Sequence, residues 1–356
     1  MCLFSTFVCV SQQNMDTIYG NPKRVFDKIL ILDKNLKRDF KRFSRASNVI
    51  DIEMYRKRSL VNFLEDNNKM YLNLKRKYSR NGLLMNQSFS DFNKDYNLTL
   101  KYEYDTKNRL IEENEIYDKT DFVQIKNVYN SKDSIIASTT SFSILPNDIV
   151  HTYYYRNSEN RMTHYKRVYN DGISVFFYDL NRDNKIIKKY RVDFGNNDEY
   201  QKLGDSIFFK NRELSLMEVN EYDENGNLIL EKKYNEKSKL IFKRFSKFDK
   251  FNNLIYIEYS SRLNDVKSYT HIKLNYDKYN NKIEYSKLYE NKYALENTKF
   301  YYENNLLSST VTISGNQILK TDFKYKFDKH ENWTEILKVV NGVNKYKWKR
   351  KISYHN

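Results

Sequence analysis

The sequence has few of the residues that interrupt or cross-link a chain. Its 356 residues include 8 glycines, 2 prolines and 2 cysteines. Collagen-like repeats and proline-rich linkers need far more glycine or proline, so both classes are excluded. Cys2 and Cys9 both lie in the first dozen residues. The rest of the chain therefore has no disulfide framework, thiolate nucleophile or cysteine-based zinc site.

Histidines and catalytic glycine motifs are equally scarce. The five histidines form no metal-binding pair, and the closest two, His151 and His164, are 13 positions apart. The chain contains no G-x-S-x-G elbow, P-loop or dinucleotide-binding fingerprint. We therefore expect a protein that is not an enzyme and that binds no cofactor and no metal.

Long apolar runs are absent beyond the N-terminus, so we expect no transmembrane helix. Residues 1–12 resemble the apolar core and cleavage zone of a secretory signal peptide, although no Lys or Arg precedes that core. A start further upstream and a lipid anchor on Cys9 stay open as alternatives. This segment predicts a protein that is secreted or located in the periplasm or cell envelope.

Aromatic and basic residues are abundant instead. Aromatics make up 16% of the chain, with 32 Tyr and 22 Phe, which is too much β-favouring surface for a disordered protein. The net charge is +16 and the sequence pI is about 9.3. Such a charge attracts polyanions. An AT-rich genome, which enriches Lys, Asn, Ile and Tyr together, explains the same composition without a ligand.

A repeated motif is the strongest signal in the sequence. In its clearest copy, Tyr222 and Asp223 are followed by Asn225-Gly226-Asn227 and then Leu228. Later copies begin at steps of 26, 28, 26 and 25 residues, at Phe248, Tyr276, Tyr302 and Phe327. Looser copies precede them, at Tyr78, Phe92, Tyr104, Tyr129, Tyr155 and Tyr178. The stretch 195–205 breaks the period.

Each copy has the chemistry of a turn between two strands. The aromatic residue ends one strand, and the Asp side chain accepts hydrogen bonds from the backbone of the turn. An Asn or Gly adopts positive φ, and an apolar residue opens the next strand. This turn role explains Asp223, Asp249, Asp277 and Asp328, whereas a glycosidase needs two carboxylates held in a cleft, which no pair outside the repeats suggests.

The repeat predicts an all-β fold. Apolar and polar residues alternate around the turns, as in 319–327 and 346–354, which indicates half-buried antiparallel strands. A step of about 26 residues equals one hairpin, so the chain should form a meander of antiparallel β-hairpins that curls into a long twisted sheet or an open shell. We divide it into the signal-like segment 1–12, an N-terminal entry segment 13–69 and the repeat array 70–356. Residues 53–65 are the best helix candidate.

The Tyr-Asp-x-x-Gly/Asn-Asn-Leu pattern resembles the YD repeats of RHS-type proteins, in particular the short secreted YD-repeat proteins of Bacteroidota. Residues 326–342 are similar to the closing repeat of those proteins, and residues 18–33 to their entry segment. The resemblance spans about residues 70–356 and implies an exported all-β repeat protein with no assigned activity. Large RHS proteins enclose a toxin, a role that we do not carry over to this chain.

The most pointed binding candidate is a set of lysines near the C-terminus. They alternate with aromatic residues, so they should share one face of two strands: Lys324, Lys326, Lys345, Lys347, Lys349 and Lys351. Such a face can bind phosphates or acidic sugars. Lysines on a terminal strand also guard an exposed sheet edge against aggregation, and we consider both interpretations.

We expect a non-catalytic exported scaffold that acts structurally or in interactions at the cell envelope. The alternative is a binding module for polyanions or glycans that uses the basic strand face. The expected partner is a protein or glycan at the cell surface, and nucleic acid is less favoured. The sequence leaves the oligomeric state open.

Overall fold

The computed structural model describes residues 18–37, 63–64, 73–90, 97–117, 121–145, 147–194, 214–263, 266–289 and 294–355. The signal-like segment 1–12 lies outside the described residues. The described part of the chain forms 22 strands: β1 Pro22–Ile31, β2 Asn73–Tyr78, β3 Leu84–Ser90, β4 Asn97–Tyr104, β5 Leu110–Tyr117, β6 Asp121–Tyr129, β7 Ile135–Phe142, β8 Val150–Arg156, β9 Met162–Val168, β10 Ile173–Leu180, β11 Ile186–Phe194, β12 Ser215–Tyr222, β13 Leu228–Tyr234, β14 Leu240–Phe248, β15 Leu254–Leu263, β16 Val266–Tyr276, β17 Lys282–Tyr289, β18 Ala294–Glu303, β19 Leu306–Ser314, β20 Gln317–Phe327, β21 Trp333–Val340 and β22 Val343–Tyr354.

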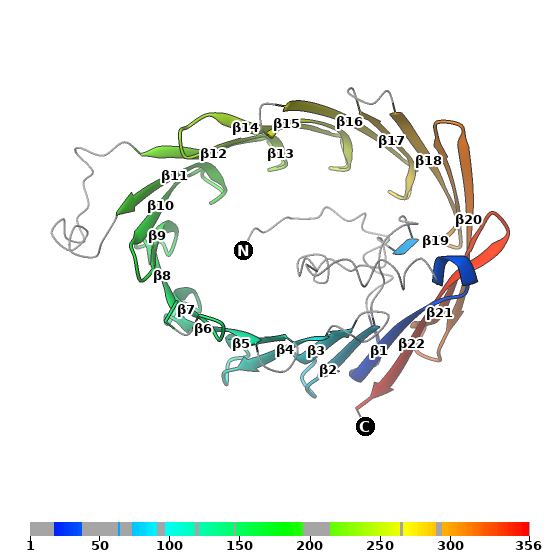
Figure 1. Cartoon of the computed structure of the whole chain (residues 1–356), viewed down its shortest axis with the longest axis horizontal. Coiled ribbons are helices and arrows are strands. Elements are labelled where there is room, and N and C mark those ends of the chain that lie inside the picture. The colour runs from blue at the N-terminus through cyan, green and yellow to red at the C-terminus, as the bar shows by residue number, and fades with distance from the viewer. Residues whose placement is uncertain are drawn as a thin grey trace.

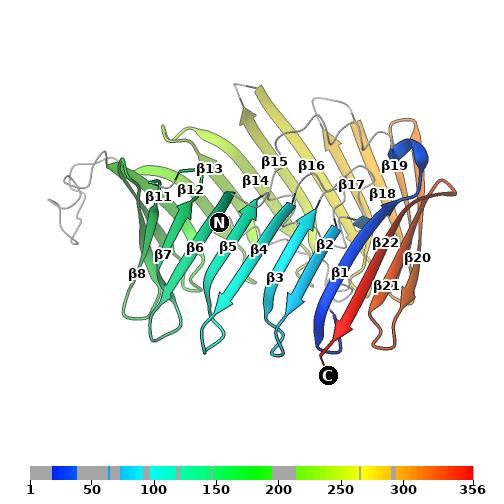
Figure 2. The same ribbon diagram turned by 60° about the horizontal axis from the view of Figure 1, so that its bottom comes forward.

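These strands form a single antiparallel sheet that closes on itself. Each strand pairs with the next along the chain, and β1 pairs with both β2 and β22. The result is a flattened ring in which the first and last strands lie side by side (Figures 1 and 2). The predicted all-β meander of hairpins is confirmed, and the curled sheet is a closed shell. The entry segment assigned to 13–69 contributes β1 to this sheet.

Strand pairing assigns every side chain in a strand to one of two faces. Residues directly opposite each other share a face, so Phe323, Lys338, Tyr346 and Ile31 form one row across β20, β21, β22 and β1. Residues 63–64 lie inside the ring (Figure 1), and the Phe63 ring contacts Trp348 on this face. This face is therefore the inner wall, and the alternate residues form the outer wall.

The largest apolar core lies on the inner wall beside the junction of the chain ends. It comprises Ile29, Ile31, Phe63, Leu64, Phe300, Leu307, Phe323, Trp333, Ile336, Tyr346 and Trp348. Residues 63–64 are helical, while the rest of the helix candidate 53–65 lies outside the described residues. A single curved sheet exposes both faces, so an inner layer of this kind supplies burial that the sheet alone lacks.

The repeated turns have the predicted geometry. In most of these turns the first residue's N–H bonds to the fifth residue's carbonyl, as in Asp249 to Asn253 at 2.9 Å. The copy at Tyr302 instead has a two-residue turn, Asn304-Asn305, with both residues at positive φ. The Asp249 carboxylate accepts from the N–H groups of Phe251 and Asn253, and Asn252 has φ of 64°. The same pattern occurs at 79–83, 105–109, 130–134, 157–161, 181–185, 223–227, 235–239, 277–281 and 328–332. The predicted turn role of these aspartates is confirmed.

The tyrosine of the repeat has a second role that the motif did not reveal. The Tyr276 hydroxyl donates to the carbonyl of Leu254 at 3.0 Å, across to the preceding hairpin. Equivalent bonds join Tyr104 to Leu84, Tyr129 to Leu110, Tyr222 to Ile186 and Tyr302 to Lys282. In these five copies the bond fastens a hairpin to the one before it, which explains why tyrosine is common at this position.

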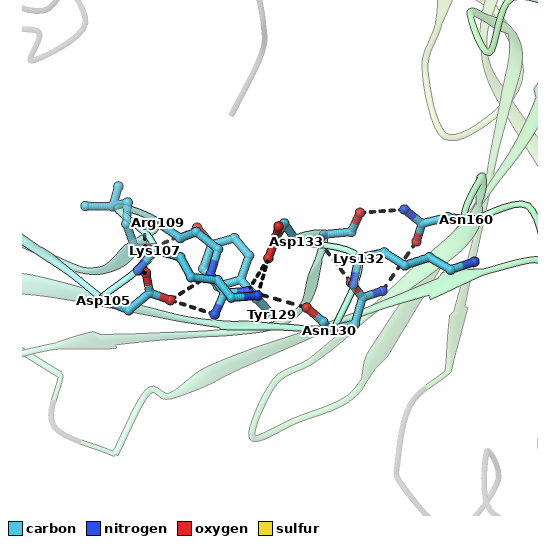
Figure 3. Close-up of polar contacts among 10 residues, drawn as sticks. Asp105, Lys107, Arg109, Tyr129, Asn130, Lys132, Asp133 and Asn160 are labelled. Carbon is cyan, nitrogen blue, oxygen red and sulfur yellow. Dashed lines mark hydrogen bonds and ion pairs between the residues drawn. The ribbon is translucent and has the colours of Figure 1, made fainter.

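Polar side chains also connect neighbouring turns along the rim of the shell (Figure 3). Arg109 donates to Asp105 at 2.6 Å within its own turn and to Asp133 of the next turn at 2.7 Å. Asn130 then donates to Asn160 at 3.3 Å. Backbone and guanidinium N–H groups of Arg109 hold the pKa of Asp105 below its usual value. These groups satisfy one another, so the rim contacts align the hairpins.

The last turn closes the rim onto the N-terminal end of the sheet. The Asn332 side chain is buried and exchanges two hydrogen bonds with the backbone of Tyr19, at 2.7 and 3.0 Å. The Tyr354 hydroxyl donates to Asp328 at 2.5 Å, and burial together with this bond raises the pKa of Tyr354 to about 12. Residues more than 300 positions apart thus complete the same rim.

Candidate functional site: the outer wall at the closing seam

The predicted lysine row lies on the outer wall beside the strand pair that closes the shell. Lys324 is in a row with Leu337 and Lys347. Lys326 and Lys349 occupy the next row, on either side of Glu335. The aromatic residues that alternate with these lysines, such as Tyr346 and Trp348, face the inner wall and are buried.

Three of the predicted lysines have carboxylate partners. Lys326 and Lys347 both pair with Glu335, at 3.3 and 3.4 Å. Burial alone would raise the pKa of Glu335, but hydrogen bonds from the two lysines hold it below its usual value. Lys345 pairs with Asp33 and lowers its pKa through the hydrogen bond between them. Two carboxylates thus offset part of the charge of these three ammonium groups.

Two of the remaining lysines, Lys349 and Lys351, belong to a larger basic surface, whereas Lys324 lies outside it, opposite Leu337. Outward side chains on β22, β1 and β2 place cations directly opposite cations, in the pairs Lys28 with Lys349 and Arg24 with Lys77. Another row reads Lys351, Phe26, Lys75 across the same strands. We call these six exposed cations the cationic seam: Arg24, Lys28, Lys75, Lys77, Lys349 and Lys351.

Like charges in directly opposite positions of a sheet repel each other and lower its stability. In the described part of the chain, no ion pair within 4.0 Å joins any residue of the cationic seam to a carboxylate. The Phe26 ring lies among these residues, with the Lys75 Nζ 5.6 Å from its centroid. The seam is thus a strip of positive charge with an aromatic ring at its centre.

The predicted edge-guarding role of the C-terminal lysines is wrong. Strand β22 pairs with β21 on one side and with β1 on the other, so it has no free edge to protect. The error arose because the sequence gives no sign that the terminal strands meet. Four of the six seam residues come from β1 and β2, which the sequence interpretation did not connect with the lysine row.

The inner wall beneath the seam carries a buried charge cluster. Asp27 is fully buried on β1 and accepts from Arg350 of β22, with the Arg350 Nε 2.7 Å from its Oδ1. Arg76 of β2 donates to its other oxygen at 2.8 Å. The Arg350 guanidinium lies 3.6 Å from the centroid of the Trp333 ring. One carboxylate therefore bonds to both strands that flank β1.

The described histidines form contacts that suit a structural role. His330 packs on Tyr354 with ring centroids 4.4 Å apart, and the His271 Nδ1 lies 3.0 Å from the Tyr256 hydroxyl. His164 stacks on Tyr155 at 4.2 Å. Among the described residues, no group of three or more His, Cys, Asp or Glu side chains is arranged to hold a metal ion.

No family model matches the chain, and no curated protein matches its sequence. Among solved structures, it is similar to the crystal structure of TcdB2-TccC3-Cdc42, with 9% identity and a TM-score of 0.31 over 80% of this chain. The TcdB2-TccC3 structure without its hypervariable C-terminal region gives 9% identity, a TM-score of 0.32 and 80% coverage. This chain spans only 18% of either structure's matched chain.

A porin-like protein from Bacteroides uniformis ATCC 8492 is also similar, with 8% identity and a TM-score of 0.27, over 95% of this chain and all of that one. These likenesses concern the architecture alone, and membership of the YD-repeat family stays a prediction. No helix in the described part of the chain is long and apolar enough to cross a membrane.

Proposed function

We propose that this protein is a non-catalytic shell that binds an acidic glycan through the cationic seam on its outer wall. The observation that carries the proposal is the placement of Lys28 opposite Lys349 and of Arg24 opposite Lys77. These pairs repel each other in the free protein. A bound anionic chain replaces that repulsion with attraction. The same cations that lower the stability of the free protein therefore favour binding of the anion.

The spacing of the seam suits an extended polymer. Outward residues along a strand, such as Lys349 and Lys351, repeat every second residue, or roughly every 6.6–6.8 Å, and neighbouring strands are roughly 4.8 Å apart. A chain that carries an acidic group every few ångströms can contact several of these cations at once. Each contact displaces counterions, so the affinity should depend steeply on salt.

Phe26 favours a sugar polymer over a nucleic acid. Its half-buried ring offers one apolar contact in the middle of the row between Lys351 and Lys75. Proteins that bind single-stranded nucleic acid generally use several aromatic platforms for successive bases. Export to the cell envelope, expected from residues 1–12, belongs to the same proposal, because acidic glycans are accessible there.

Binding to heparin, used as an acidic-glycan probe, tests the proposal. The triple variant K28Q/K75Q/K351Q, in which no substituted lysine lies opposite a carboxylate, should elute from heparin at lower salt than the natural chain, and its affinity should fall less steeply with salt. The matched control K126Q/K299Q/K320Q also removes three exposed outward lysines. Each of these faces a carboxylate, namely Glu112, Glu284 and Asp322.

The control separates a local site from general charge, because both variants lose the same net charge. Equal losses in the two variants, or no salt-dependent binding by the natural chain, would overturn the proposal. A single-stranded oligonucleotide of matched charge serves as the competing probe. Tighter binding of the oligonucleotide than of heparin would contradict the glycan assignment.

A further inference from the structure

The inner wall behind the seam has a surface, formed by Phe323, Trp333, Lys338 and Trp348, that is covered by residues 63–64 of the same chain. We call this surface the seat. Phe63 and Leu64 are each 1% exposed, although they belong to no strand of the sheet. The Phe63 ring packs edge-on against Trp348 with centroids 5.1 Å apart. Trp348 in turn packs edge-on against Trp333 at 5.0 Å. The wall therefore offers an aromatic surface that one inserted ring completes.

Lys338 gives this seat a polar anchor. It lies on β21 and is fully buried, and its Nζ donates to the backbone carbonyl of Phe63 at 2.7 Å and of Leu64 at 3.5 Å. The same ammonium lies 5.5 Å from the Phe63 ring centroid and 5.8 Å from that of Phe323. A buried ammonium needs acceptors, because desolvation of its charge is costly. The seated segment supplies two of them.

The chemistry of the seat specifies its occupant. The aromatic wall requires an aromatic side chain beside an aliphatic one, and Lys338 requires main-chain carbonyls at the same place. A free lipid or sugar lacks this combination, whereas a peptide provides all of it. Phe63 and Leu64 contact the wall through their side chains and their backbone carbonyls. A separate peptide that contains the same Phe-Leu pair has the same groups.

We infer that this seat is a peptide-binding site and that residues 63–64 are its resident ligand. A separate peptide with an adjacent aromatic and leucine residue binds at the same place when residues 63–64 do not occupy it. The shell then acts on two faces, since an acidic polymer binds outside and a peptide binds inside. The inner site depends on Lys338, Trp348 and Phe323 and does not rest on the proposed function of the outer wall.

The two tryptophans of the chain report on the seat directly. Trp333 and Trp348 are its only tryptophans, and both belong to the core cluster that contains Phe63. The full-length double variant F63A/L64A should emit at longer wavelength than the natural chain, because water reaches the indole rings. Adding a synthetic peptide of residues 57–70, KRSLVNFLEDNNKM, should reverse this shift in a saturable way.

A control peptide with alanine in place of the Phe-Leu pair should leave the spectrum unchanged. The two peptides are compared on one folded variant, so a difference between them does not reflect stability. If the double variant does not fold, F63A alone vacates the ring site beside Trp348. The further substitution Lys338→Met should weaken binding of the peptide by about tenfold or more.

Equal responses to the two peptides, or no response of either vacated variant, would overturn the inference. If the Lys338→Met protein bound the peptide as tightly as before, the Lys338 ammonium would not anchor the peptide. Heparin binding by the same variants is measured in parallel. It should be unchanged, so a failure of the inner site is distinguishable from a failure of the outer one.

Discussion

The two faces of β22, β1 and β2 differ in how their charged side chains are paired. On the inner wall, Asp27 is placed between Arg350 and Arg76 and bonds to both. On the outer wall, one residue further along the same strand, Lys28 lies opposite Lys349. Glu335 is on the other side of Lys349, but neither lysine forms an ion pair within 4.0 Å among the described residues. The inner charges join the strands that close the shell, while the outer charges oppose that closure. Fold stability therefore explains the charges on the inner wall but not those on the outer wall, which is why we propose a binding role for the outer ones.

The largest effect should follow from removing the inner carboxylate. Asp27→Asn leaves two guanidinium groups close together, one of them on the almost fully buried Arg350. Breaking a buried pair in this way costs about 3–5 kcal/mol. Chemical denaturation of the variant should show a loss of unfolding free energy of this size. Lys28→Gln is the matched control on the outer wall, and it should leave stability unchanged or raise it slightly. A stable Asp27→Asn protein would contradict the closing role of Asp27.

A smaller effect on the inner wall should follow from removing one tyrosine hydroxyl. Tyr276→Phe removes the bond to the Leu254 carbonyl and leaves the ring in place. The expected loss is about 0.5–1.5 kcal/mol, measured by denaturant unfolding. Phe248 occupies the same repeat position one hairpin earlier. Phe248→Tyr should therefore gain stability if its hydroxyl reaches the Leu228 carbonyl, and a loss there would show that the hydroxyl is not what selects tyrosine.

The difference between the faces also marks what the sequence can and cannot reveal. Turns are local, so five residues that begin with Asp and contain Asn or Gly near their end are enough to predict a hairpin. The structure has these hairpins. The alternation of Lys349 with Trp348 and Arg350 is likewise visible in the sequence. The contact of Asp27 with Arg350 spans 323 positions and leaves no local pattern.

The sheet closes because twist accumulates over all of its strands. The sequence of one hairpin does not determine whether that twist brings β1 beside β22. The sequence interpretation therefore left β1 apart from the repeat array and missed four of the six residues of the cationic seam. The basic segment 23–28 was an available signal, because Arg24 and Lys28 share one face of a strand and the charge of the C-terminal lysine row. It was not interpretable without knowing that β1 lies beside β22.

A charge reversal on the outer wall should separate stability from binding. Lys28→Glu places a carboxylate opposite Lys349 and converts a repulsive pair into an attractive one. Cross-strand pairs of this kind contribute about 0.2–1 kcal/mol, so the melting temperature should rise. Heparin affinity should fall at the same time. A variant that loses stability, or that binds heparin as tightly as the natural chain, would remove the argument that the seam is maintained for binding.

The smallest effect concerns the rim, where the first residue of a turn accepts the same backbone hydrogen bonds whether it is Asp or Asn. Burial alone would raise the pKa of Asp249, but hydrogen bonds from the Asn253 side chain and from the N–H groups of Asn253 and Phe251 hold it below 3.8. Because the folded-state pKa is the lower one, this carboxylate stabilises the fold at neutral pH, and the contribution disappears as the pH falls below about 4 towards the folded-state value.

Asp249→Asn keeps the turn, since Asn130 and Asn157 accept the same backbone hydrogen bonds in other repeats. The variant should unfold close to the natural chain at pH 7 and should lose less stability between pH 4 and pH 2.5, as followed by thermal melts. An identical pH profile in both proteins would show that the Asp249 charge makes no contribution of its own. The rim would then owe its stability to the geometry of the turn, which Asn supplies as well as Asp.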